Sequence, residues 1–238
     1  MRFEGKRAFV TGAASGIGAA TVELLSAEGA RVVGADIAPA EGVVRCDVTD
    51  KASVASAVDA AVEQLGGLDV CANVAGVDVF SRFEDLSVEL FERHLSVNLV
   101  GPMLVTQAAL PHLKRSKGNV VTVASISGLQ GQPYNSAYCA SKGGVLLLMR
   151  SLAVELAADG VRVNCVCPGG VETPLVAGAT QGLPPDADLG LFDRMNGVLH
   201  GGGYMPPSHV AESIAYLASD AAASVTGAAL VIDRGTLW

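Results

Sequence analysis

Short apolar runs alternate with segments of helical periodicity along almost the whole chain, and this alternation restricts the fold more than any other feature. Seven runs have the length and composition of buried strands: residues 6–12, 31–36, 43–48, 68–76, 118–127, 161–169 and 228–233. Apolar strands separated by helices are typical of a parallel sheet that helices cover on both faces. We therefore predict a single α/β domain over residues 1–238, with a doubly wound, seven-stranded parallel sheet.

Residues with strong cap or turn preferences mark the ends of the helical segments. Asp50 can cap a helix over residues 51–65, which Gly66 ends, and Gly160 closes a long helix over residues 138–160. Further helices are expected over residues 16–30, from about 87 to 116, and over 209–222.

The segment 175–207 departs from this regularity, because it is rich in Gly and Pro and lacks a clear period. An irregular connection of this length within a compact domain is usually functional. We therefore predict that it forms a substrate-binding lid within the single domain.

The turn after the first predicted strand reads TGAASGIG and contains Gly12, Gly16 and Gly18. Such glycines let the backbone approach the pyrophosphate of a dinucleotide at a helix N-terminus, as in the Rossmann fold. Asp36 follows at the end of the second strand, where a carboxylate can bind the adenosine ribose and repel a 2′-phosphate. Asp47, at the next strand end, could meet the adenine amino group. These features predict NAD rather than NADP; the alternatives are a tight turn without a ligand and two ordinary turn aspartates.

Composition and charge exclude several other classes of protein. Half of the residues are hydrophobic and 17% are charged, which argues against a disordered chain. The net charge is −8 without a cluster of Lys or Arg, so neither nucleic acid nor an anionic membrane is an expected partner. No apolar run approaches the ~20 residues of a membrane span, and the N-terminus does not resemble a signal peptide. We therefore expect a cytoplasmic protein with reduced cysteines and no metal site.

A tyrosine precedes a lysine by four residues in the stretch SAYCASKGG. On a helix, Tyr138 and Lys142 would lie on one face, one turn apart. A neighbouring cation favours the phenolate, so the pair could supply a base from a group that ordinarily titrates near pH ~10. Taken alone, such a pair is more often a packed tyrosine and a solvated lysine, since the spacing recurs by chance in many helices.

Five motifs in order over essentially the whole chain resemble the short-chain dehydrogenase/reductase family. The family's TGxxxGxG motif matches residues 11–18, and its PGxVxTP motif matches 168–174. Its catalytic Asn, Ser, Tyr and Lys match a set of four residues: Asn98, Ser125, Tyr138 and Lys142. Two motifs depart from the family pattern, because Val74 replaces the second Asn of NNAG and Arg234 replaces the first Gly of DGG.

The resemblance implies a role for each matched residue. Tyr138 would be the general acid/base, and Lys142 would lower its pKa and bind the nicotinamide ribose. Ser125 would hold the substrate oxygen, and Asn98 would hold a water that links Lys142 to solvent. The cofactor-binding residues so implied, together with those at the strand ends, are Gly12, Ser15, Gly16, Ile17, Gly18, Asp36, Asp47, Val48, Asn73, Ala75, Gly76, Tyr138, Lys142, Pro168, Gly169, Val171 and Thr173.

The resemblance also implies hydride transfer between NAD(H) and a secondary alcohol or ketone. The predicted lid carries many apolar residues and few charges, which favours an apolar substrate such as a hydroxysteroid or a cyclic or aryl alcohol. Two alternatives stay open: a regulator that binds NAD(H) without turnover, and a 3-oxoacyl thioester reductase. An epimerase or dehydratase of the longer related family is disfavoured by the short chain and the glycine spacing.

Self-association is a further expectation. The helix over residues 138–160 contains the continuous apolar run 145–148, which exceeds what packing on a sheet requires. Members of the family commonly associate through this helix, so we expect a homotetramer or homodimer. Trp238 is expected either at a subunit contact or in a frayed chain end.

Overall fold

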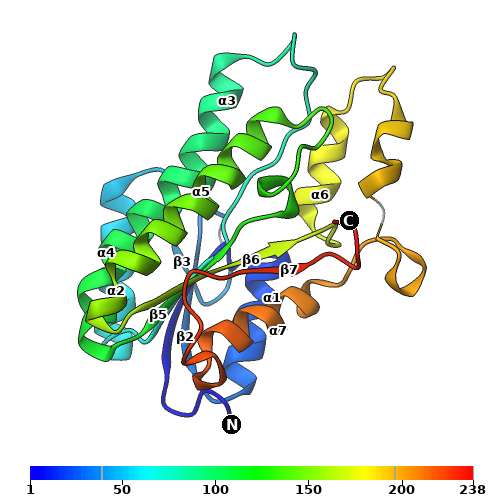
Figure 1. The fold of residues 1–238 in the computed structure, drawn as a ribbon. Helices are drawn as coiled ribbons and strands as arrows, with labels where there is room; N and C mark the ends of the chain where they lie inside the picture. Colours follow the sequence, from blue (N-terminus) through cyan, green and yellow to red (C-terminus); the bar gives the residue numbers. More distant parts are fainter. Residues whose placement is uncertain (39, 196, 238) are drawn as a thin grey trace.

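The computed structural model describes residues 1–38, 40–195 and 197–237, so the expectation for Trp238 falls outside the described residues. The described chain contains one seven-stranded sheet in the order β3-β2-β1-β4-β5-β6-β7 (Figure 1). Every neighbouring pair of strands is parallel. The strands are β1 (Arg7–Thr11), β2 (Arg31–Asp36), β3 (Val43–Arg45), β4 (Val70–Asn73), β5 (Asn119–Val123), β6 (Arg162–Pro168) and β7 (Ala229–Ile232). The predicted doubly wound sheet is confirmed.

Helices cover both faces of the sheet (Figure 1). One face carries α1 (Gly16–Ala27) and α7 (Pro207–Ala218), and the other carries α2 (Lys51–Leu65), α4 (Gly101–Ser116) and α5 (Ser136–Glu155). Successive strand residues point to opposite faces, so Phe9 and Val10 of β1 enter two different apolar clusters. Of the helices in the described ranges, none combines the length and the apolar character that crossing a bilayer would require.

The predicted cap residues occupy the helix ends. The Asp50 carboxylate accepts a hydrogen bond from the Ala52 N–H at 3.0 Å and caps α2. Gly66 ends the same helix with φ 80°, and Gly160 follows the last turn after α5 with φ 75°. Both glycines take the left-handed conformation that L side chains rarely adopt.

The helix expected over residues 87–116 is not regular. Ser87 caps α3 (Val88–Leu95), and α4 follows, but the π-helical turn η1 (Ser96–Val100) lies between them. A π-turn places one additional residue in a helical turn and is frequent at functional sites. Here it contains Asn98, so the irregularity coincides with one of the predicted catalytic positions.

The chain first adds β2 and β3 on one side of β1 and then crosses back to add β4 and the later strands on the other side. The strand order therefore reverses between β1 and β4. In open α/β sheets, ligands bind in the crevice outside the carboxyl ends of the strands at this point. The fold therefore places the turn after β1 and the turn after β4 side by side.

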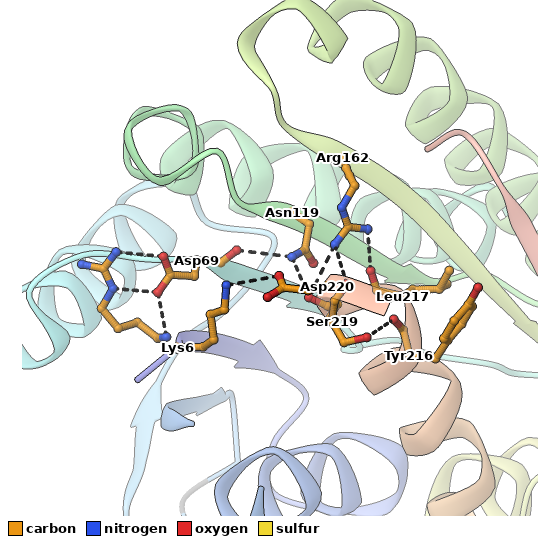
Figure 2. Close-up of polar contacts among 10 residues, drawn as sticks. Lys6, Asp69, Asn119, Arg162, Tyr216, Leu217, Ser219 and Asp220 are labelled. Atoms are coloured by element: carbon orange, nitrogen blue, oxygen red, sulfur yellow. Dashed lines mark hydrogen bonds and ion pairs between the residues drawn. The ribbon is translucent and has the colours of Figure 1, made fainter. Parts of the chain in front are cut away.

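The opposite, amino end of the sheet carries a network of paired polar groups (Figure 2). Arg7 forms a two-pronged ion pair with Asp69, with Nε–Oδ2 at 2.8 Å and Nη2–Oδ1 at 2.9 Å. The guanidinium of Arg162 donates to the carbonyls of Leu217 at 2.7 Å and Ser219 at 3.2 Å, where α7 ends. Side chains from other strands thus satisfy the last carbonyls of this helix.

The predicted lid leaves the sheet after Val171 and returns at Met205, where the two residues form a parallel bridge. Between them lie α6 (Pro174–Ala179) and the short 3-10 turns η4 (Thr180–Gly182), η5 (Leu189–Met195) and η6 (Leu199–Gly201). Arg82 holds the segment through an ion pair with Asp186 at 2.6 Å. The segment is therefore ordered against the loop that follows β4.

Candidate active site

A cavity of about 760 Å³ opens at the carboxyl ends of the central strands, within the size range of ligand sites. It brings together most of the residues that the sequence motifs indicate. The predicted residues in its lining are Gly12, Ser15, Gly16, Ile17, Gly18, Asp36, Asp47, Val48, Ala75, Gly76, Ser125, Tyr138, Lys142, Pro168, Gly169, Val171 and Thr173. Asn73 and Asn98 are not brought to the cavity wall.

The glycine turn after β1 forms a cradle that side chains would fill. A Cβ on Gly18 would lie 1.9 Å from the carbonyl oxygen of Gly12, and one on Gly12 would lie 2.7 Å from the Ala75 nitrogen. Helix α1 starts at Gly16, and the side chain of its N-cap residue, Ser15, makes no capping hydrogen bond. The first N–H groups of α1 are thereby left for an anionic ligand, so this turn fits a pyrophosphate.

The two predicted aspartates flank the part of the cavity beyond β2 and β3. The Asp36 oxygens accept hydrogen bonds from the N–H groups of Ala14 at 3.0 Å and Ala38 at 2.9 Å. Each carboxylate oxygen can accept a further bond, so ribose hydroxyls fit here. Asp47 accepts bonds from the hydroxyl and the N–H of Thr49, which lower the pKa of its carboxyl. The residues present therefore fit the adenosine end of a nicotinamide dinucleotide.

Tyr138, Lys142 and Ser125 converge at the other end of the cavity. The Lys142 ammonium is buried, donates to the Val123 carbonyl at 2.9 Å and lies 5.5 Å from the centre of the Tyr138 ring. Burial lowers the pKa of Lys142 to about 8. The Ser125 hydroxyl accepts a hydrogen bond from the Ser127 N–H at 3.1 Å, which orients it.

The pKa of Tyr138 differs from the expectation drawn from the sequence. Burial, and next the negative charge of Asp78, raise the pKa of the phenol above its ordinary value, while the Ser125 hydroxyl opposes the shift. The phenol is therefore protonated at neutral pH, as a proton donor must be.

Asn98 acts on the loop after β4 rather than on the cavity. Its amide nitrogen donates to the Val77 carbonyl at 2.9 Å, and its amide oxygen accepts from the Val77 N–H at 2.9 Å. The same nitrogen also donates to the Ser141 hydroxyl of α5 at 3.0 Å. Asn98 thus fixes the loop against the helix that carries Tyr138; its implied role in holding a water stays a prediction.

The NNAG departure has a structural account. Asn73 is buried, and its amide nitrogen donates to the hydroxyls of Thr106 and Thr122, both at 3.1 Å, so it joins β4 to α4 and β5. Val74 packs against the apolar cluster beneath α1 and α7, and its N–H donates to the Thr11 hydroxyl at 3.1 Å. A valine at this position therefore gains apolar packing where the family has an amide.

The DGG departure also has an account. Arg234 takes φ 56°, a conformation that costs a non-glycine residue on the order of 1 kcal/mol. Its guanidinium donates to the Gly202 carbonyl at 2.9 Å, and its own carbonyl accepts the N–H groups of Val198 and Leu199. The arginine thereby fastens the end of the lid segment to the C-terminal strand, which offsets the backbone strain.

The lid lining differs from what its apolar composition indicates. Leu175 and Val176 of α6 line the cavity, whereas Leu191, Val198 and Leu199 are exposed to solvent. Phe192 instead stacks on Tyr134 and meets the edge of Phe80, and Met205 is part of the core. The segment 175–207 has neither a helical nor a strand period, so its sequence could not indicate which apolar side chains face the cavity.

Several lining residues lie outside the family motifs, and two of them, Asp78 and Arg93, are charged. Asp78 stands two positions after Gly76, and this proximity to the family motif is the only sequence signal for it. In the part of the chain that the structure describes, no group of three or more His, Cys, Asp or Glu side chains could hold a metal ion.

Comparisons with known proteins agree with this geometry. A family model described as enoyl-(acyl carrier protein) reductase matches residues 12–236. Cis-4-hydroxycyclohexanecarboxylate dehydrogenase of Sinomonas cyclohexanicum is 43% identical over 98% of this chain and 97% of that protein. Meso-2,3-butanediol dehydrogenase of Serratia marcescens is 37% identical over 99% and 96%. The crystal structure of a short chain dehydrogenase from Mycobacterium paratuberculosis bound to NAD superposes with TM-score 0.92, 29% identity and 99% coverage of both chains.

Proposed function

The chain belongs to the short-chain dehydrogenase/reductase family, and from this premise we propose that it is an NAD-preferring dehydrogenase of neutral secondary alcohols. It is an oxidoreductase that interconverts an alcohol and a ketone. One observation carries the proposal: Ser125, Tyr138 and Lys142 meet in the same cavity as the glycine cradle and Asp36. The non-catalytic regulator is disfavoured, because such a protein needs no acid/base group beside the cofactor.

Each residue of the site has a separate role in the proposed reaction. An oxidised nicotinamide dinucleotide held by these residues would supply the hydride acceptor, and its positive charge would favour the phenolate of Tyr138. Tyr138 takes the hydroxyl proton as the alcohol becomes a ketone, and returns a proton to the oxygen in the reverse direction. Ser125 donates a hydrogen bond to the substrate oxygen and holds it at the phenol. Lys142 binds the nicotinamide ribose and stabilises the phenolate.

Apolar contacts support a neutral, largely apolar substrate. Leu175, Val176 and Val79 line the cavity close to the catalytic groups, and we propose that the segment 175–207 closes over the substrate. The names of two relatives, a hydroxycyclohexanecarboxylate dehydrogenase and a butanediol dehydrogenase, support small cyclic alcohols or diols over bulky thioesters.

The cofactor preference is tested by titrating the protein with NADH and NADPH and following the fluorescence of the reduced nicotinamide. We expect NADH to bind at least about 10-fold more tightly, which corresponds to ~1.4 kcal/mol. Asp36→Asn should narrow this difference, whereas Asp85→Asn, which removes an exposed carboxylate outside the cavity, should preserve it. Tighter NADPH binding by the unaltered protein would refute the role of Asp36 and leave the catalytic groups untouched.

Activity is tested by following NADH formation with a panel that contains cyclohexanol, aryl carbinols and hydroxysteroids, and NADH consumption with a 3-oxoacyl thioester. We expect oxidation of at least one cyclic or aryl alcohol. Tight NADH binding without turnover of any compound would favour the regulator, and efficient reduction of the thioester alone would favour the 3-oxoacyl reductase.

We also propose that the chain forms a homotetramer or homodimer through α4 and α5. Leu147 and Val154 on the outer side of α5 are 69% and 81% exposed, and Val100 before α4 is 38% exposed. Apolar side chains this exposed on neighbouring helices are typical of a contact between subunits. Light scattering should give the mass of the oligomer, and Leu147→Glu should reduce it.

A further inference from the structure

Asp78 places a carboxylate in the wall of the cavity and leaves one of its two oxygens without a partner. The residue lines the cavity beside Tyr138, and its Oδ1 is buried with no hydrogen-bond partner among the described residues. Buried acceptors are nearly always paired, and an unpaired one is costly. Rotation about χ2 exchanges the two carboxylate oxygens, so either oxygen can be the one that lacks a hydrogen-bond donor.

The backbone on both sides of Asp78 is fixed by side chains. Asn98 binds both the N–H and the carbonyl of Val77, each at 2.9 Å. The Val79 N–H donates to His94 Nε2 at 3.2 Å, and the other ring nitrogen, Nδ1, donates to the Leu90 carbonyl at 2.8 Å. The position of the carboxylate is therefore set in advance of any ligand.

The same clamp ties Asp78 to the catalytic tyrosine. His94 is fully buried and meets the Tyr138 ring edge-on, with ring centres 6.3 Å apart. Asn98 also bonds Ser141, one turn along α5 from Tyr138. Two buried side chains thus fix the loop that carries Asp78 relative to the phenol. A site that binds one ligand at two points requires such a fixed arrangement.

A purely structural carboxylate would look different. Asp69 at the other end of the sheet pairs with Arg7 through two hydrogen bonds, whereas no described Lys or Arg forms an ion pair with Asp78. Burial raises the pKa of Asp78 and outweighs the hydrogen bond that the Asn135 side chain gives its carboxylate. A donor from outside the chain is the partner that Oδ1 still lacks.

Resting on the proposed function, we propose that Asp78 determines specificity by accepting a hydrogen bond from a second hydroxyl of the substrate, so that the preferred substrates are neutral cyclic diols. One hydroxyl is oxidised: its carbon loses a hydride to the oxidised dinucleotide, and its oxygen loses a proton to Tyr138. The second hydroxyl is bound at Asp78 and leaves unchanged. A substrate with a carboxylate at that position is rejected by like charge.

The test compares kcat/KM for cyclohexanol with kcat/KM for the cis and trans isomers of 1,2-, 1,3- and 1,4-cyclohexanediol. We expect the wild-type protein to prefer at least one diol over cyclohexanol by about 10-fold or more, because a site built to bind a hydroxyl discriminates against its absence. Asp78→Ala should remove this preference mainly through KM for the diol. The readout is the ratio of kcat/KM for the diol to kcat/KM for cyclohexanol, because loss of the charge that raises the pKa of Tyr138 affects both substrates alike. Asp78→Leu, which is close in shape and carries no hydrogen-bond acceptor, serves if the alanine variant does not fold.

Measurements on two further variants distinguish the possible outcomes. Asp85→Asn removes an exposed carboxylate of the same loop and should leave the diol preference intact. Asp78→Asn should improve turnover of a cyclohexanol that carries a carboxylate. The inference is overturned if the wild-type protein shows no diol preference, or if Asp78→Ala lowers kcat/KM for cyclohexanol and diols equally. Absence of oxidation of every alcohol would instead overturn the proposed function itself.

Discussion

The two ends of the sheet differ in how completely their aspartates are paired. At the amino end, Asp69 and Arg162 are bound to Arg7 and to helix carbonyls by short hydrogen bonds (Figure 2). At the carboxyl end, the Asp78 Oδ1 has no partner within the described chain, and Ser15 leaves the start of α1 uncapped. Paired groups stabilise the fold, and groups left unpaired are available to a ligand. Substitutions at the two ends should therefore separate stability from activity.

The largest separation is expected at Tyr138. Tyr138→Phe removes the hydroxyl that exchanges a proton with the substrate, and general acid/base groups contribute about 10²–10⁴-fold to rate. We expect kcat/KM to fall by roughly 10³-fold while the thermal midpoint and NADH binding stay close to wild type.

Tyr216→Phe is the matched control, because it removes the same hydroxyl from a 42% exposed side chain on α7. Steady-state kinetics and thermal melts of both variants make the comparison. Equal losses of activity, or a loss of stability confined to Tyr138→Phe, would contradict the division between the two ends.

The converse effect is expected at Arg162. Arg162→Met keeps the aliphatic stem but removes the side-chain donor of the Leu217 carbonyl and one of the two donors of the Ser219 carbonyl. We expect the free energy of unfolding to fall by about 2–3 kcal/mol, with kcat/KM of the folded enzyme unchanged. Urea unfolding measures the loss, and Arg115→Met on the exposed surface of α4 should cost far less. A kinetic defect without a shift in the urea midpoint would show that the amino end reaches the active site.

A smaller and pH-dependent effect is expected at Asp69. Burial alone would raise the pKa of this carboxyl, but the hydrogen bonds from Arg7 outweigh burial and lower it. The stabilisation is therefore fully present above the ordinary aspartate pKa near ~3.9 and is lost as pH falls through the lowered value.

Asp69→Asn should cost about 1–2 kcal/mol at pH 7, and its difference from wild type should shrink as the pH approaches 3. Urea midpoints at pH 7, 5 and 3.5 measure this trend. A difference that stays constant or grows on acidification would mean that the ion pair does not account for the stabilisation.

Local patterns in the sequence predicted the elements of the fold and most of the cavity wall. The period of the apolar residues gave the strands, Asp50 and Gly66 gave helix ends, and the glycine turn located the cradle. These features depend on neighbours in the chain, so a sequence displays them directly.

What could not be predicted depends on contacts between distant segments. Asn98 reaches the backbone of Val77, 21 positions away, and Arg234 reaches Gly202 across the end of the lid. The raised pKa of Tyr138 arises from burial and from Asp78, neither of which a four-residue spacing reveals. An unpaired carboxylate can likewise be recognised only when the positions of all possible hydrogen-bond donors are known.

The π-helical turn over residues 96–100 makes the length of this helix part of the active site. Each residue of an α-helix advances the side chains by about 100° around the axis, so deleting one residue from the turn would restore a regular helix and rotate Asn98 away from Val77. The loop bearing Asp78 would lose its clamp although every amino acid that contacts the cavity had been kept. Chimeras and indel libraries should therefore keep the number of residues in this turn fixed, in addition to keeping Asn98 itself.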